Sequence, residues 1–168
     1  VAEAVQVAAP AVTVVPARGG LGEDVEVQAN TVASVMAAKL GAKYRMLHIP
    51  DGLSEETLEA ILINDGNVRA VAEMIRRADI LVHGIGQARE MAERRNMEEA
   101  ALEEIISGGA VGEALGHYCT LNGEIVHVTN SVGLRLDELE HIGLVVAVAG
   151  GRNKAEAIVA VTGAGALS

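Results

Sequence analysis

Short apolar runs alternate along the chain with longer segments in which apolar residues return every three or four positions. The runs have the length of strands, and their lack of polar positions is typical of strands covered by helices on both faces. In the first of the longer segments, Val27, Thr31, Val35 and Ala38 fall at helical spacing on one stripe. The pattern predicts strands at 11–15, 44–49, 79–83, 124–128 and 144–149, and helices at 23–40, 67–77, 87–95 and 153–160.

Strands that alternate with helices indicate βαβ units and a mainly parallel sheet. We therefore predict an α/β fold: one Rossmann-like domain over residues 1–168, with a mainly parallel sheet and helices on both faces. Asn122-Gly123 is a hairpin-type turn signal, so one β-hairpin is expected beside the parallel strands. The opening residues, VAEAVQV, lack a Met and look like the end of a helix, which suggests a piece of a longer protein.

Composition adds limits on the partners. Half of the 168 residues are apolar, but there is no Phe or Trp, so the core must be built from aliphatic side chains, Met and Ala. The formal charge is −10, and a surface this acidic repels a nucleic-acid backbone. The single Cys119 excludes an internal disulfide and a cysteine metal cluster, and it fits a reducing cytoplasm. No apolar stretch approaches the ~20 residues of a membrane span, so no membrane partner is expected.

The loop ARGGLGED follows the first predicted strand and leads into a helix. Gly19, Gly20 and Gly22 let the backbone approach a ligand and turn amide groups toward it, and Arg18 adds a planar fork suited to phosphate. Gln28, further along, is able to reach back to the same place. An ordinary glycine-rich turn with a surface arginine explains the loop equally well.

The strand at 79–83 ends in a second glycine loop, Gly84-Ile85-Gly86, followed at once by a helix. This is only part of a dinucleotide fingerprint, because Arg89 stands where the third glycine belongs and no acidic residue ends a following strand. The pattern argues against a nicotinamide cofactor. Arg94 and Arg95 lie further along the helix; one is able to point back over the loop, but a solvated pair at a helix end is the simpler interpretation.

Two titratable residues stand near these loops. His83 lies at a strand end, where catalytic histidines often occur, although a hydrogen-bonded core histidine is the commoner case. Glu113 sits among small residues in AVGEALGHY. It suits hydrogen bonds from sugar hydroxyls, and an exposed helix glutamate is the alternative.

A third junction, VAVAGGRNKAEAI, places Lys154 in the predicted first turn of a helix. A cation is unfavourable there, because the helix dipole prefers anions at its N-terminus, unless an anion binds at that end. Three strand-to-loop junctions with glycines and cations together predict an anion pocket sized for a small phosphorylated molecule.

Five phrases, in order, carry a resemblance: VPARGGLGEDVEVQANTVA, ADILVHGIGQAREMAERRN, AVGEALGHY, LNGEIVH and VAVAGGRNKAEAI. The chain resembles the effector-binding domain of SorC-type bacterial transcriptional regulators from about residue 1 to 158. The resemblance implies a fold like that of sugar-phosphate isomerases and deaminases. It also implies a phosphorylated sugar as ligand, fructose-1,6-bisphosphate in members that control glycolysis. Family members carry a DNA-binding domain and a first strand with a phosphate loop ahead of the region that matches VAEAV.

The resemblance also implies roles for particular residues. Arg18 with Gly19 and Gly20 would hold one phosphate, with Lys154 also at a phosphate. Gln28, Arg94 and Glu113 would contact the sugar or its phosphates. Charge placement and loop geometry alone single out four of these positions and leave Gln28 and Arg94 ambiguous.

The function expected is therefore a sugar-phosphate sensor that acts on DNA only through a further domain, forms a homo-oligomer, needs no cofactor and is not an enzyme. The rival is a sugar-phosphate isomerase or deaminase on the same fold, for which Glu113 and His83 are the only candidate proton-transfer groups. A nucleotide-binding module that reads NAD at HGIG is a third possibility.

Overall fold

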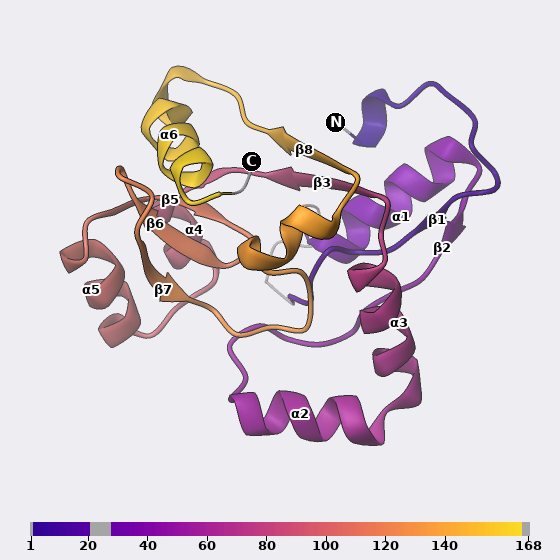
Figure 1. The fold of residues 1–168 in the computed structure, drawn as a ribbon, viewed down its shortest axis with the longest axis horizontal. Coiled ribbons are helices and arrows are strands. Elements are labelled where there is room, and N and C mark those ends of the chain that lie inside the picture. Colours follow the sequence, from indigo (N-terminus) through magenta and orange to yellow (C-terminus); the bar gives the residue numbers. More distant parts are fainter. Residues whose placement is uncertain (1, 21–27, 166–168) are drawn as a thin grey trace. The chain divides into compact units, whose positions relative to one another are not determined.

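The computed structural model describes residues 2–20 and 28–165. The chain forms two compact units, Val1–Arg77 with Asn130–Gly133 and Ala78–Thr129 with Leu134–Ser168. Figure 1 labels the helices and strands of both units. No helix of the described residues has the length and apolar character to cross a membrane.

The first unit starts with a βαβ arrangement. Strand β1 (Thr13–Val14) is parallel to β2 (Lys43–Tyr44), and helix α1 (Ala29–Leu40) lies between them in the chain. A 3-10 helix, η1 (Ala2–Ala4), packs against α1. Helix α1 ends at Gly41, whose φ of +64° is the left-handed conformation that lets the chain bond back onto the last helical turn. The predicted helix is confirmed from Ala29 on, and its predicted positions 23–27 lie outside the described residues.

The strand predicted at 44–49 is wrong beyond its first residue. The backbone of this segment finds other partners: the N–H of Leu47 donates to the Asn30 side chain over 3.0 Å, and the carbonyl of Ile49 accepts from the N–H of Gly20 over 2.9 Å. Buried backbone groups need partners of some kind, and a side chain and a loop supply them here in place of a strand ladder.

Two helices follow in the first unit. Helix α2 (Glu55–Asn64) begins after Ser54, whose hydroxyl accepts from the N–H of Thr57, and no helix was predicted there. Helix α3 (Gly66–Arg76) confirms the prediction at 67–77. It begins after Asp65, whose carboxylate accepts two backbone N–H groups of the first turn.

The second unit holds a parallel pair, β3 (Ile80–Gly84) and β8 (Leu144–Val148), with Ile80 opposite Leu144. Both strands were predicted. A 3-10 helix, η3 (Leu136–His141), precedes β8.

The larger sheet of this unit is antiparallel, in the order β4 (Gly86–Gln87), β5 (Ala110–Ala114), β6 (His117–Thr120) and β7 (Ile125–Val128). The mixed α/β class is confirmed, whereas a mainly parallel sheet is not. The reason is the short connections, since a tight turn can join only antiparallel neighbours. The turn at Asn122-Gly123 is the hairpin expected from the sequence, with Gly123 at φ +86°.

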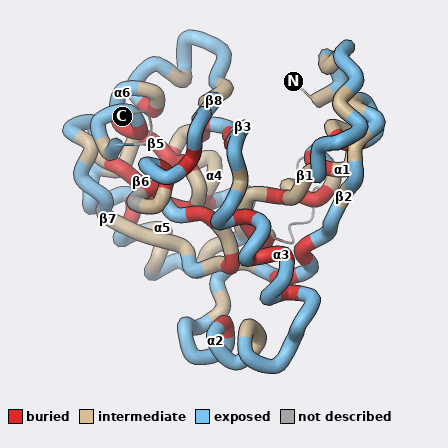
Figure 2. The backbone as a smooth tube through the Cα atoms, turned by 45° about the vertical axis from the view of Figure 1, so that its right-hand side comes forward, coloured by how far each residue is buried: buried red, intermediate tan, exposed pale blue. Residues whose placement is uncertain are grey.

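Three helices cover this sheet. Helices α4 (Ala88–Arg94) and α5 (Glu99–Ser107) pack against each other, and α6 (Ala155–Gly163) packs on β5 after a 3-10 turn, η4 (Arg152–Lys154). The helices predicted at 87–95 and 153–160 are confirmed, with small shifts in their ends. In Figure 2, buried residues of this unit, drawn in red, lie around β5 and β6. The core there consists of Ala88, Ala92, Ile105 and Tyr118.

Candidate functional site

In the first unit, Arg18 is a buried cation. Only 8% of the surface of Arg18 is exposed, and its guanidinium donates to the carboxylate of Asp51 over 2.9 Å. The backbone of Arg18 forms an antiparallel bridge with Gly133, which fixes the chain direction at this point. The interpretation of Arg18 as a surface arginine is therefore wrong.

The glycines after Arg18 serve close packing. The N–H of Gly19 donates to the carbonyl of Val132 over 2.7 Å, and the N–H of Gly20 donates to the carbonyl of Ile49. A Cβ on Gly19 would stand 2.8 Å from the oxygen of Ile49, and Gly20 has a φ of +149°. Both amides thus bond within the protein, and the lack of side chains lets the neighbouring backbone approach closely. Gly22 lies outside the described residues.

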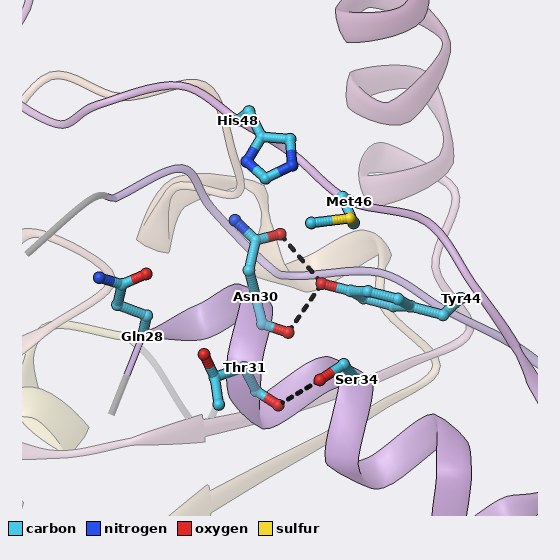
Figure 3. A pocket seen from close by; sticks show the side chains of 7 residues that line it. All are labelled: Gln28, Asn30, Thr31, Ser34, Tyr44, Met46 and His48. Carbon is cyan, nitrogen blue, oxygen red and sulfur yellow. Dashed lines mark hydrogen bonds between the residues drawn. The ribbon is translucent and has the colours of Figure 1, made fainter. Parts of the chain in front are cut away.

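Gln28 lines a pocket of about 190 Å³ at the N-terminal end of α1 (Figure 3). Asn30 fixes the wall of this pocket. Its side-chain amide donates to the carbonyl of Leu47 over 2.7 Å, and its backbone carbonyl accepts from the Tyr44 hydroxyl over 2.7 Å. Burial raises the pKa of Tyr44, so its hydroxyl stays protonated. The full lining is Gln28, Asn30, Thr31, Ser34, Tyr44, Met46 and His48.

In the second unit, Lys154 and Arg94 converge on one carboxylate. The ammonium of Lys154 donates to Glu90 Oε2 over 2.9 Å, and the guanidinium of Arg94 lies 3.9 Å from Glu90 Oε1. Lys154 is the residue before α6 and the end of η4, so it stands at the helix start as predicted. The lysine and the arginine that the sequence marked separately are thus neighbours.

Glu113 is buried on β5, with 3% of the residue exposed, so the exposed-helix interpretation is wrong. Its Oε1 accepts from the guanidinium of Arg95 over 3.0 Å and from the N–H of Gly116 over 2.7 Å. Arg95 also donates to the hydroxyl of Tyr118 over 2.9 Å. Of the arginine pair, Arg95 is the one that turns inward, while the side chain of Arg94 is half exposed.

Sequence reasoning missed the role of Arg95. The available signal was Glu113 itself: a glutamate flanked by small and apolar residues is buried only with a cation beside it. An arginine pair elsewhere in the chain was the natural source of that cation.

His83 is a buried histidine on β3, 7% exposed. Its Nδ1 lies 3.1 Å from the carbonyl oxygen of Gly84, which can only accept, so Nδ1 carries the proton. Burial lowers the pKa of His83, and the hydrogen bond to Gly84 and the charge of Glu113 only partly offset that effect. The ring is therefore neutral at pH 7.

The glycine loop after His83 differs from a dinucleotide loop. Gly86 belongs to a short strand, β4, which separates β3 from helix α4. A Cβ on Gly86 would meet the side chain of Met91, so this glycine makes room for the helix. Among the described residues, no group of three or more His, Cys, Asp or Glu side chains could hold a metal ion.

The predicted site residues therefore form two sets. Arg18, Gly19, Gly20 and Gln28 belong to the first unit, whereas Arg94, Glu113 and Lys154 belong to the second. Within the second set, Glu90 joins Lys154 to Arg94, and Glu113 is held by Arg95 instead. In both units, the cations marked as phosphate ligands lie against a carboxylate of the protein.

The class of protein follows from comparison with known families. A family described as "Putative sugar-binding domain" matches residues 1–167, and the chain belongs to this family. It is similar to structures of SorC-type regulators: a SorC family transcriptional regulator from Enterococcus faecalis matches at 41% identity and a TM-score of 0.82. That match covers 90% of this chain and 61% of the other.

Particular relatives are closer in sequence. The central glycolytic genes regulator of Priestia megaterium is 49% identical over 149 residues, covering 89% of this chain and 43% of the relative. The protein of the same name from Bacillus subtilis is 49% identical over 144 residues, covering 86% of this chain and 42% of the relative. The chain thus spans about two fifths of the length of the curated relatives it matches.

Proposed function

We propose that this chain binds a phosphorylated sugar, with fructose-1,6-bisphosphate as the effector, and thereby controls a repressor of glycolytic genes. One observation of the structure carries the proposal: Lys154 and Arg94 converge on a single carboxylate in a chain whose net charge is −10. Two clustered cations in an acidic protein suit a small anion that is held locally. The 49% identity to central glycolytic genes regulators supports the choice of effector.

The residues proposed to contact the effector follow the two sets. In the first unit they are Arg18 with Gly19 and Gly20, at a phosphate, and Gln28, at the sugar or its phosphates. In the second unit they are Lys154 at a phosphate, with Arg94 and Glu113 at the sugar or its phosphates. DNA would be bound through a further domain, and the regulator would work as a cytoplasmic homo-oligomer without a cofactor.

Isothermal titration calorimetry tests this function. The protein is purified as its gene encodes it. It is then titrated with fructose-1,6-bisphosphate, glucose-6-phosphate and unphosphorylated fructose. We expect the bisphosphate to bind and fructose not to bind, because charge-assisted hydrogen bonds to phosphate supply most of the affinity. Absence of binding for every phosphorylated sugar would contradict the proposal.

The rival enzymatic function gains no support from the geometry. Glu113 is engaged by Arg95 and by the N–H of Gly116, and His83 is buried, with 7% of the residue exposed. Neither group is arranged to move a proton between substrate carbons. Turnover of ribose-5-phosphate or glucosamine-6-phosphate by the purified protein would favour the enzyme instead.

A further inference from the structure

We propose that Glu90 is an internal counter-anion: it occupies the place of a ligand phosphate at Lys154 and Arg94, and a phosphate must displace it to bind. This inference rests on the proposed function and assigns Glu90 a role in setting the affinity of the same site. Glu90 would oppose binding, and weaker anions would fail to displace it.

The contacts of Glu90 resemble those of a bound oxyanion. One carboxylate oxygen accepts from Lys154 over 2.9 Å, and the other lies 3.9 Å from the guanidinium of Arg94. Two oxygens of one group thus face two separate cations, which is how a phosphate engages such a pair. The hydrogen bond from Lys154 is the main reason that the pKa of Glu90 is lowered, so the carboxylate is charged at neutral pH.

Glu90 can leave this place at little cost. Its side chain is 40% exposed, whereas the side chain of Glu113, which pairs with Arg95, is only 4% exposed. An ion pair with a carboxylate this exposed contributes little to stability, because water solvates the carboxylate once it separates from Lys154, whose own side chain is 17% exposed. A dianionic phosphate gains more from the same two cations than the carboxylate loses.

The cations stay in position without Glu90. The side-chain amide of Gln87 donates to the backbone carbonyl of Asn153 over 2.9 Å, which ties the turn before Lys154 to the start of α4. The amide of Asn153 completes the pair with a bond to Gln87 over 3.4 Å. Because this double contact fixes the backbone, Glu90 is not needed to place Lys154.

The experiment compares two substitutions that each remove one negative charge from α4. Glu90→Gln removes the carboxylate that faces Lys154, while Glu93→Gln removes an exposed one that pairs with Arg89 at 3.8 Å. Both proteins are titrated with fructose-1,6-bisphosphate and with inorganic phosphate. We expect E90Q to bind the bisphosphate roughly three- to tenfold more tightly than wild type, and E93Q to stay within about twofold.

The outcomes separate three cases. Tighter binding by E90Q alone supports the inference, and Glu90→Ala should show the same gain, which guards against a residual bond from glutamine. Unchanged or weaker binding by both Glu90 variants, with wild-type binding intact, overturns it and makes Glu90 a residue that positions Lys154. If neither wild type nor any variant binds a phosphorylated sugar, the proposed function fails and the inference fails with it.

Discussion

At the scale of single residues, carboxylates decide what each cation does. Arg18, Lys154 and Arg95 all lie against an acidic side chain, but the exposure of that side chain differs. Glu113 is nearly inaccessible and Glu90 is not. The same residue types therefore form a buried ion pair in one place and a partly exposed ion pair in another.

Lys154 should be essential for binding and dispensable for folding. Lys154→Met removes a charge-assisted hydrogen bond to the effector, a loss of about 1.5–3 kcal/mol, or roughly 10- to 100-fold in affinity. Calorimetry with fructose-1,6-bisphosphate measures the loss. Lys39→Met, which removes an exposed lysine from α1, is the matched control and should bind as wild type does. Equal affinities for the two variants would contradict the role of Lys154.

Arg95 should matter for stability. Arg95→Met leaves the Glu113 carboxylate buried without its cation, and we expect the free energy of unfolding to fall by about 3 kcal/mol or more. Urea denaturation measures the change. Adding Glu113→Gln should recover part of it, because the buried charge is then gone. The neighbouring Arg94→Met removes a half-exposed arginine and should cost at most about 0.5 kcal/mol.

At the scale of elements, the sequence predicted those whose hydrophobic pattern was regular. Strands β3 and β8 are almost wholly apolar, and α3 has a clear helical stripe. Helix α2 was missed although Ser54 before EETLEAILI is a capping signal. Strand β5 carried no usable signal, because Gly112 and Glu113 are poor strand formers. Both are explained only by tertiary contacts: Gly112 lies against Ala157 of α6, and Glu113 meets Arg95.

The hairpin between β6 and β7 depends on Gly123. This glycine has a φ of +86°, and a Cβ there would clash with the backbone of Gly163. Gly123→Ala should therefore cost more than the ~1–2 kcal/mol of a left-handed alanine alone. Gly109→Ala is the matched control, since Gly109 has a φ of +76° but no atom within 4 Å of the added Cβ. Equal costs in urea denaturation would contradict the close approach of Gly163.

At the scale of the whole chain, the class of fold could be predicted from the sequence further than the topology. The apolar strands indicated an α/β fold, which is confirmed, and Lys154 stands at the start of α6 as expected, whereas the anion site stays a prediction. Of the antiparallel sheet, only β7 and its hairpin turn at Asn122-Gly123 were foreseen, because β4, β5 and β6 carry no strand-like pattern. The pairing of cations with Glu90, Asp51 and Glu113 is a property of the folded units, which sequence spacing does not contain.

On acidification, the protonation of His83 and the change in net charge should have opposite effects on the stability of the whole molecule. Acidification from pH 7 toward the isoelectric point near 4.9 lowers the negative charge and relieves self-repulsion. His83 acts in the opposite direction, because its pKa is lowered in the folded protein. Above pH 6.5 the ring is neutral in both states and has no effect. Below pH 6.5, His83 takes up a proton in the unfolded chain before it does so in the folded protein. The free energy of unfolding therefore falls until the pH is lower than the pKa of His83 in the folded protein.

Urea denaturation at pH 7.5 and 5.5 isolates this term. His83→Asn keeps an N–H donor for the Gly84 carbonyl but cannot titrate, so its stability should fall less between the two pH values than that of wild type. Because a single proton is taken up, the free energies of unfolding of wild type and H83N should diverge by at most about 1.4 kcal/mol per pH unit. His141→Asn replaces an exposed histidine and should retain the wild-type loss. If H83N and H141N lose stability equally, the buried ring of His83 is not the source of the loss.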